Sequence, residues 1–425
     1  MTAADGPQPH PLLGAVFGAL EERRVRWCVL RGADELAFDG AHPPGDVDLM
    51  VHPADLAAFR AATTRLGFAE MPSWGYGSHT FHLAYDAASD TWIKLDVVTE
   101  FGFGAGFALL ADVAPAVLAR CRNVGGVRMP ALEDAFWCLL LHKLLDKGRI
   151  PDDVHGELQY LAASACLDSP LAWAVDGVAT PDIAAERIVA LVRRGEWEAL
   201  DALGPSLALA WERCDRARTL RRKISQRFWR QMGKLLRRVR RQGLTVALLG
   251  PDGAGKSSAA AAVRDAFYFP GDIVYMGPAQ PRGGGALPPG LSFLARVAAQ
   301  LRRWARARGL QSRGRLVLFD RYAFDALLPP RRPLSRLSRW RRTLLARSCP
   351  PPALTVILDA PGELLYARKG EQTPDILEAE RRAYLALAAR LRCAAIVDAS
   401  QPPDAVRRAV TAAIWDRWRR RWTPH

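Results

Sequence analysis

The residues best suited to do chemistry in this chain form a glycine-rich segment near its middle. The pattern G-x-x-x-x-G-K-S runs from Gly250 to Ser257, between an apolar run and an alanine-rich stretch. Glycines let the backbone curl so that successive N–H groups point at one phosphate chain, and a helix N-terminus adds its positive end. Lys256 is expected to reach the β- and γ-phosphates of ATP, while the Ser257 hydroxyl holds Mg²⁺. The predicted nucleotide-binding residues are Gly250, Gly253, Gly255, Lys256, Ser257 and Ser258.

A second group of chemically capable residues lies near the N-terminus and consists of acids. Asp46 and Asp48 alternate in an apolar run, so both carboxylates project from one face of a strand. Asp96 lies inside another apolar run, where a buried acid is costly without a partner. Because a divalent cation removes the repulsion between neighbouring carboxylates, these three acids predict a Mg²⁺ site. The histidines that could approach the same cleft, or be satisfied by local hydrogen bonds, are His79, His82 and His142.

The C-terminal half resembles a known enzyme family. The segment "GPDGAGKSS" (250–258) resembles the P-loop of thymidylate kinases and related nucleoside-phosphate kinases. Three later segments are similar to that family in the same order: "LVLFDRYAFD" (316–325), "LDAPGELLYARKGEQTP" (358–374) and "AAIVDASQPPDAVRRAV" (394–410). The resemblance implies a P-loop kinase fold, with ATP and Mg²⁺ as cofactors.

The same resemblance implies roles for individual side chains. Asp252 would lie beside the phosphates and the acceptor, and Asp320 would lie near Mg²⁺. Arg321 would bind the anionic group of the acceptor, and Arg368 with Lys369 would reach the transferring phosphoryl group from a lid. The alternative for Asp320 and Arg321 is a local surface ion pair. The expected catalytic residues are therefore Lys256, Asp252, Asp320, Arg321 and Arg368.

The N-terminal acids are similar to the pattern of the nucleotidyltransferase superfamily. In that pattern a Gly, here Gly32, precedes Asp-x-Asp, and a third acid follows on a later strand. The resemblance implies that Asp46, Asp48 and Asp96 bind metal and that Gly32 contacts the nucleotide. Ala33 stands where many members have Ser or a second Gly, so Arg31 is the alternative phosphate contact. The competing interpretation is a turn at a strand end with solvated acids.

The elements that position these residues predict an α/β fold. Apolar runs at 244–249, 315–319, 353–358 and 394–397 are typical of parallel strands buried on both faces, with helices between them. Shorter runs at 25–32, 46–51 and 92–98 predict strands of an α+β domain, and helical spacing follows from 131. The expected parts are a nucleotidyltransferase-like domain (1–130), a helical extension (131–215), a basic linker helix (216–242) and a thymidylate kinase-like P-loop domain (243–425).

The segment 206–242 is expected to form one long basic helix. Its apolar positions Phe228, Met232, Leu235, Leu236 and Val239 fall on one stripe. Such a stripe favours packing against a neighbouring domain over contact with a membrane surface.

The net charge of +15 is concentrated in two segments. Residues 216–241 hold twelve Arg or Lys and no acid, and residues 296–347 hold fifteen Arg and two Asp. These segments suit an anionic membrane surface, nucleic acid or a phosphorylated small molecule, or they are solvated helix faces. Seven scattered Cys without a C-x-x-C pair indicate reduced thiols, and neither a signal peptide nor a transmembrane run is apparent. We therefore expect a cytoplasmic protein, and a homodimer is left open.

Three functions remain open from the sequence. The first is an ATP-dependent phosphotransferase that acts on an anionic nucleotide or another phosphorylated metabolite. The second is a nucleotidyltransferase that uses the N-terminal acids, with the P-loop domain as a regulatory ATPase. The third is a nucleotide-sensing adaptor without catalysis. Thymidine monophosphate is disfavoured as acceptor because the residues after Asp320-Arg321-Tyr322 depart from the thymidylate kinase pattern.

Overall fold

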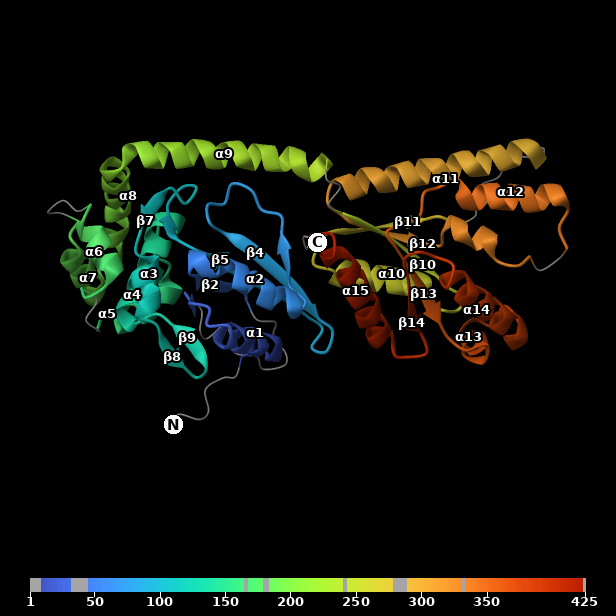
Figure 1. Cartoon of the computed structure of the whole chain (residues 1–425), viewed down its shortest axis with the longest axis horizontal. Coiled ribbons are helices and arrows are strands. Elements are labelled where there is room, and N and C mark those ends of the chain that lie inside the picture. Colours follow the sequence, from blue (N-terminus) through green and yellow to red (C-terminus); the bar gives the residue numbers. More distant parts are fainter. Residues whose placement is uncertain are drawn as a thin grey trace. The chain divides into compact units, whose positions relative to one another are not determined.

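The computed structural model divides the chain into two compact units (Figure 1). The N-terminal unit comprises residues 1–234 with 422–425, and the C-terminal unit comprises residues 235–421. Both units are mixed α/β, which confirms the expected fold class at this level. The residues that the structure describes are 9–31, 45–163, 167–178, 183–239, 243–277, 289–330 and 333–422.

The N-terminal unit contains a five-stranded mixed sheet in the order β1-β2-β5-β4-β3. Its strands are β1 (Trp27–Val29), β2 (Val47–Val51), β3 (Ala69–Met71), β4 (Thr80–Asp86) and β5 (Thr91–Val98). Only β2 and β5 pair in parallel, and their register sets Asp48 beside Asp96. Burial alternates along β5, so Leu95 and Val97 enter one core while Asp96 projects from the opposite face.

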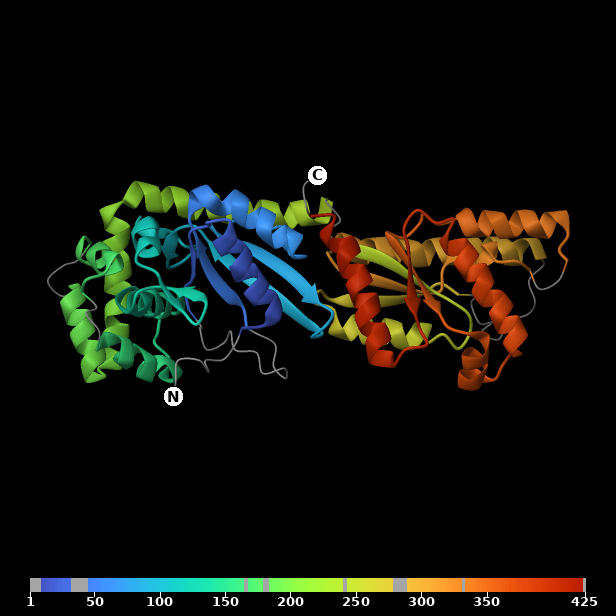
Figure 2. The same ribbon diagram turned by 60° about the horizontal axis from the view of Figure 1, so that its bottom comes forward.

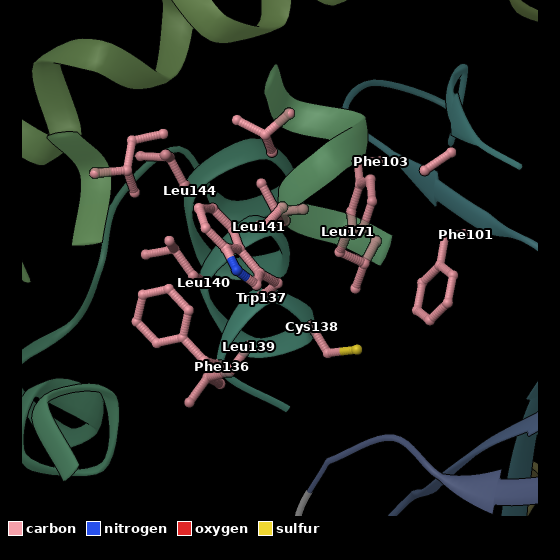
Figure 3. Packing of buried hydrophobic residues seen from close by; sticks show 14 of the residues in the cluster. Phe101, Phe103, Phe136, Trp137, Cys138, Leu139, Leu140, Leu141, Leu144 and Leu171 are labelled. Atoms are coloured by element: carbon pink, nitrogen blue, oxygen red, sulfur yellow. The ribbon is translucent and has the colours of Figure 1, made fainter. Parts of the chain in front are cut away.

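Helices cover both faces of this sheet. Helices α1 (Pro11–Glu22) and α2 (Leu56–Arg65) lie on the face that buries Leu95 (Figure 2). A larger helical layer packs toward the other face around Trp137 (Figure 3). This layer consists of α3 (Ala114–Ala119), α4 (Leu132–Leu141), α5 (His155–Ala162), α6 (Pro170–Asp176), α7 (Ala185–Arg194) and α8 (Trp197–Cys214). The segment 131–215 is therefore helical as expected, and it shares one hydrophobic core with Met50 and Val98 of the sheet.

Short elements complete the N-terminal unit. Two hairpins are formed by β6 (Phe101–Phe103) with β7 (Leu109–Ala111), and by β8 (Arg122–Val124) with β9 (Val127–Met129). Single turns of 3₁₀ helix span Pro53–Asp55 and Asp152–Val154, and a π-helical segment spans His142–Lys147.

The prediction of one long basic helix over residues 206–242 is wrong. Helix α8 ends at Cys214, and α9 (Arg216–Val239) begins after Asp215, whose side chain accepts a hydrogen bond from the Arg218 N–H at 3.0 Å. The packing of its apolar stripe against a neighbouring domain stays a prediction, and Met232 and Leu236 of the stripe are partly buried. Phe228 and Leu235 are both exposed, and the side chain of Val239 lies outside the described residues.

The C-terminal unit is built on a five-stranded sheet in the order β11-β12-β10-β13-β14, and every pairing in it is parallel. Its strands are β10 (Leu244–Leu249), β11 (Gly271–Tyr275), β12 (Leu316–Asp320), β13 (Leu354–Asp359) and β14 (Ala394–Asp398). Four of them match the predicted apolar runs, while β11 was not predicted. Its single fully buried residue, Val274, explains why no continuous apolar run marks this edge strand.

Helices pack on both faces of this parallel sheet (Figure 2). They are α10 (Lys256–Ala266), α11 (Pro289–Ser312), α12 (Arg336–Arg347), α13 (Gly362–Lys369), α14 (Pro374–Ala388) and α15 (Pro403–Arg419), with a 3₁₀ segment at Ala323–Leu327. The chain leaves the central strand β10 toward the β11 edge and leaves its neighbour β13 toward the β14 edge. In parallel sheets, ligand sites lie beyond the carboxyl ends of the strands at such a reversal.

Candidate functional site

The loop that joins β10 to α10 has a backbone that only glycine adopts easily. Gly250, Gly253 and Gly255 have φ values of +149°, +87° and +79°. A Cβ atom on Gly250 would lie 2.7 Å from the Leu358 carbonyl oxygen, and one on Gly253 would lie 2.8 Å from that of Leu365. Backbone angle therefore requires all three predicted glycines, and close packing also requires Gly250 and Gly253.

Lys256 begins α10 and folds its side chain back under this loop. Its side chain is only 7% exposed, and Nζ donates to the carbonyl oxygens of Gly250 at 2.9 Å and Pro251 at 2.7 Å. Burial, and then the Arg321 guanidinium, lower the pKa of Lys256 from its usual value. A lysine held in this way by carbonyls of its own loop can exchange them for the phosphate oxygens of a bound nucleotide.

Ser257 and Asp320 meet at the carboxyl end of β12. The Ser257 hydroxyl donates to Asp320 Oδ2 at 2.5 Å, and Asp320 is 8% exposed. Two hard oxygen ligands at one point, beside a candidate phosphate loop, are the donor set that Mg²⁺ takes together with phosphate oxygens and water. The residues predicted to hold Mg²⁺ and to lie near it are thus in contact.

Arg321 pairs with Asp252 instead of forming a local pair with Asp320. Its Nη2 donates to Asp252 Oδ1 at 2.7 Å, across 69 residues of chain. Burial alone would raise the pKa of Asp252, but the Arg321 and Lys256 cations lower it below its usual value. Arg321 also has φ +67°, a left-handed backbone that costs a non-glycine residue about 1–3 kcal/mol. The surrounding structure must therefore hold this guanidinium in place.

These side chains line one cleft of about 340 Å³ at the carboxyl end of the parallel sheet. Arg368 and Lys369 reach it from the end of α13, where Arg368 Nη1 donates to the Ala399 carbonyl at 2.9 Å and Lys369 pairs with Glu371 at 3.1 Å. Tyr275 also lines the cleft and was missed, because the strand β11 that ends with it was not predicted. The lining residues are Asp252, Gly253, Gly255, Lys256, Ser257, Ser258, Tyr275, Asp320, Arg321, Arg368 and Lys369.

A second pocket of about 310 Å³ follows β12 on the side of α11 and α12. Arg303 lines it and donates to the Gly277 carbonyl at 2.7 Å, whereas Arg302 and Arg306 are exposed. The sequence between this pocket's Gly277 and helix α11 is rich in Gly and Pro, and its residues 278–288 lie outside the described residues. The net charge of residues 296–347 therefore overstates how many of their arginines face this pocket.

Asp325 is a further residue of this pocket that the sequence did not single out. Burial raises its pKa to about 6, and its Oδ1 accepts a hydrogen bond from the Tyr384 hydroxyl at 3.1 Å. It lies on the 3₁₀ segment five residues after Asp320, so the Asp-Arg-Tyr segment was its only signal. Asp325 places an acid that is half protonated near pH 6 beside the basic lining of the pocket.

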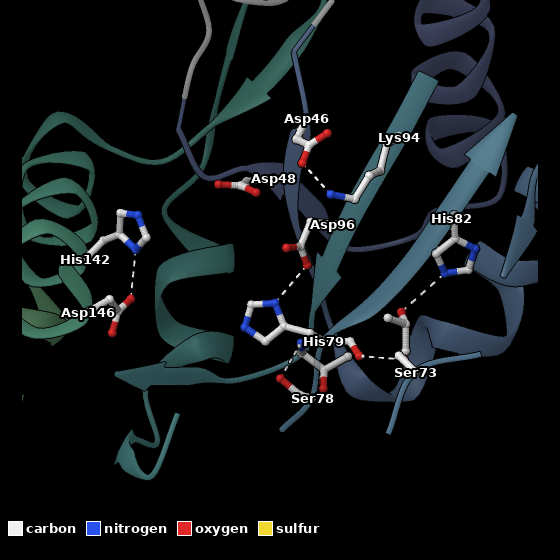
Figure 4. Close-up of polar contacts among 12 residues, drawn as sticks. Asp46, Asp48, Ser73, Ser78, His79, His82, Lys94, Asp96, His142 and Asp146 are labelled. Atoms are coloured by element: carbon white, nitrogen blue, oxygen red, sulfur yellow. Dashed lines mark hydrogen bonds and ion pairs between the residues drawn. The ribbon is translucent and has the colours of Figure 1, made fainter. Parts of the chain in front are cut away.

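The N-terminal acids lie together on one side of the sheet (Figure 4). Each carboxylate has a cationic or imidazole partner of its own. The pairs are Asp46 with Lys94, Asp48 with Arg31 at 2.5 Å, and Asp96 with His79 at 2.8 Å. These partners offset the cost of partly burying Asp48 and Asp96 without a metal ion, while Asp46 is exposed.

The other predicted residues of the N-terminal site fall into three groups. His142 bonds to Asp146 at 2.8 Å on the π-helical segment, and burial lowers the pKa of His142. His82 is buried beside Thr80, away from the acids (Figure 4), and burial lowers its pKa to about 3. Gly32 lies outside the described residues. Within the described ranges, no group of three or more His, Cys, Asp or Glu is arranged to hold a metal ion, so the Mg²⁺ site of Asp46, Asp48 and Asp96 stays a prediction.

No protein-family model matches this chain, and no curated protein matches it. Among the helices of the described ranges, none is long and apolar enough to cross a bilayer. The function therefore has to be inferred from the side chains of the two sites.

Proposed function

We propose that the C-terminal unit is a P-loop phosphotransferase that resembles thymidylate and nucleoside-monophosphate kinases and transfers the γ-phosphoryl group of ATP. The observation that carries this proposal is the convergence of Lys256, Arg321 and Arg368 with the Ser257–Asp320 pair in one cleft. Phosphoryl transfer depends mainly on positioning and on neutralising charge, and a cleft lined in this way provides both.

Each side chain has a role that follows from its contacts. Lys256 exchanges its two loop carbonyls for β- and γ-phosphate oxygens, and the glycine loop supplies N–H donors. Ser257 and Asp320 would hold Mg²⁺, which supplies charge neutralisation and alignment of the phosphates when bound. Arg368 and Lys369 face the same cleft from α13 and are suited to bind the transferring group.

The acceptor would bind in the second pocket, where Met276 and Tyr322 directly follow Tyr275 and Arg321 of the cleft in the sequence. Arg303 and Arg296 line this pocket, which suits an acceptor with an anionic group such as a nucleotide or another phosphorylated metabolite. Arg321 lines the cleft, and it would bind that group when it releases Asp252. Thymidine monophosphate is disfavoured as the natural acceptor because the residues after Asp320-Arg321-Tyr322 depart from the thymidylate kinase pattern.

A nucleotidyltransferase reaction in the N-terminal unit is the second candidate. The specific observation in its favour is the register of β2 and β5, which sets Asp48 beside Asp96. Asp46 lies two residues before Asp48. For this chemistry Arg31 and Lys94 would have to release the acids to a metal ion. The candidate ranks below the kinase because, in the described ranges, no group of three or more His, Cys, Asp or Glu is arranged to hold the metal ion that it requires.

The experiment that separates these functions supplies ATP labelled at either the γ or the α position, together with an extract of small metabolites. Movement of the γ label onto a metabolite marks the phosphotransferase. Movement of the α label with release of pyrophosphate marks the nucleotidyltransferase. Binding of ATP without movement of either label would contradict both and leave the non-catalytic adaptor.

A further inference from the structure

Helix α9 packs on the N-terminal unit through its polar face. Arg222 bonds to Glu100 and, at 3.2 Å, to the Phe107 carbonyl, while Arg230 Nε donates to the Gly75 carbonyl at 2.7 Å. Gln226 lies between these arginines and is 7% exposed. Because this face of the helix is packed against the protein, the opposite face is the one that is free to meet something else.

That opposite face is apolar. Leu220, Ile224 and Phe228 repeat every four residues and are 54%, 60% and 56% exposed, and Trp229 beside them is 46% exposed. Residues spaced by four lie above one another on a helix, so these side chains form a continuous stripe. A helix of a soluble protein normally buries its apolar face and exposes its polar face. In α9 the polar face is packed on the protein and the apolar face is exposed.

Basic residues border the stripe on both sides. The exposed members are Arg216, Arg221, Arg227 and Lys234. No acid occurs between residues 216 and 241. Arginine and lysine next to an exposed apolar stripe extend their charged ends toward phosphate groups while their stems cover apolar surface.

We propose that α9 binds the surface of an anionic membrane. The helix would lie parallel to the bilayer, with Leu220, Ile224 and Phe228 at the boundary between headgroups and acyl chains. The flanking arginines and Lys234 would contact the lipid phosphates, each adding about 1 kcal/mol near the surface. This inference does not depend on the proposed phosphotransferase activity.

Charge and polarity argue against other occupants of the stripe. Nucleic acid offers phosphates to the arginines but no surface that buries Leu220 and Ile224. A second copy of α9 would bring the same basic border into contact with itself, which is repulsive. The segment 296–347 of the C-terminal unit is strongly basic too, so it is a poor partner for the same reason.

Helix α12 repeats the pattern in the C-terminal unit. Leu337, Trp340 and Leu344 are 55%, 60% and 42% exposed at helical spacing, and Arg336 and Arg339 beside them are exposed. The same combination of exposed apolar side chains and arginines on two helices supports a common target with acyl chains and phosphates.

The test is sedimentation of the full-length chain with vesicles at several salt concentrations. One vesicle contains phosphatidylglycerol in phosphatidylcholine, and the other contains phosphatidylcholine alone. We expect binding to the anionic vesicle that weakens as salt rises. The double variant Ile224→Gln with Phe228→Gln should lower binding about tenfold or more, since two apolar side chains no longer enter the bilayer. Arg221→Gln with Arg227→Gln should lower both the binding and its dependence on salt.

The matched control is Val124→Gln with Tyr160→Gln, which removes two exposed apolar side chains of the same unit far from α9 in sequence. It should bind like the parent, and thermal unfolding should show that all variants are folded. Absence of binding by the parent to anionic vesicles would overturn the proposal, as would undiminished binding by the Ile224 and Phe228 variant. A parent that is dimeric and a variant that is monomeric, neither binding vesicles, would instead identify the stripe as a contact between copies.

Discussion

Lys256 is the residue whose loss should have the largest effect on phosphoryl transfer. Its buried ammonium group donates to two loop carbonyls, and it belongs to the lining of the cleft. Removing one preorganised charge at the transferring phosphate typically lowers the rate about 100-fold or more. We therefore predict that Lys256→Ala loses γ-phosphoryl transfer while its unfolding temperature shows a folded protein. Lys147→Ala, which removes an exposed lysine of the other unit, is the control, and undiminished transfer by Lys256→Ala would contradict the assignment.

Arg303 and Arg306 should differ in their effect on the acceptor, although they are three residues apart on α11. Arg303 lines the second pocket and bonds to the Gly277 carbonyl, whereas Arg306 is exposed. We predict that Arg303→Gln raises the KM for the acceptor severalfold, because the pocket loses a cation suited to bind its anionic group. Arg306→Gln should leave KM unchanged, and steady-state kinetics of both variants make the comparison. Equal effects of the two changes would show that this pocket does not bind the acceptor.

Asp325 should make the stability of the protein depend on pH. Burial raises its pKa to about 6, so the folded state binds a proton more tightly than the unfolded chain does. The stabilisation that the protonated Asp325 carboxyl gives the folded state is complete below about pH 4, the pKa of Asp in an unfolded chain. It is lost as the pH rises through about 6. We predict that Asp325→Asn equals the parent near pH 4 and exceeds it by about 2–3 kcal/mol near pH 7.

Chemical denaturation at a series of pH values measures this difference. The control is Asp153→Asn, since Asp153 is exposed and its replacement should give parallel curves for variant and parent. A pH-independent difference between Asp325→Asn and the parent would show that the carboxyl group of Asp325 keeps an ordinary pKa.

At the scale of the element, the loop between β10 and α10 should tolerate no side chain at Gly253. Its φ is +87°, and an added Cβ would lie 2.8 Å from the Leu365 carbonyl oxygen. We predict that Gly253→Ala lowers the free energy of unfolding by about 1–3 kcal/mol and weakens ATP binding, because the loop must shift away from α13.

Gly309→Ala is the matched control for this loop. Gly309 lies within helix α11, and an added Cβ there meets nothing within 4 Å. Alanine in a helix should stabilise the protein by about 0.5–1 kcal/mol without changing ATP binding. Calorimetry of ATP binding and chemical denaturation give both quantities for each variant. If Gly253→Ala bound ATP like the parent, the loop would not be the nucleotide site.

At the scale of the whole molecule, the C-terminal unit should fold without the N-terminal half. All five strands of its sheet lie between Leu244 and Asp398, and Arg421 Nη1 donates to the Gly243 carbonyl at 2.6 Å, which ties the last helix to the first strand. We predict that the fragment 240–425 unfolds in one cooperative transition and keeps γ-phosphoryl transfer. Circular dichroism and the labelled-ATP assay test this fragment, and an insoluble or unfolded product would mean that the two halves depend on each other.

The sequence by itself predicted the glycine loop, because its glycines and Lys256 lie in one contiguous segment. It also determined four of the five parallel strands, since their buried runs are continuous. Tertiary structure decided which distant side chains meet. The parallel sheet brings the ends of β11 and β12 together, so that Tyr275 and Asp320 line one cleft. Packing also decided the orientation of α9, because helical spacing identifies an apolar stripe but not the side on which the rest of the protein will lie.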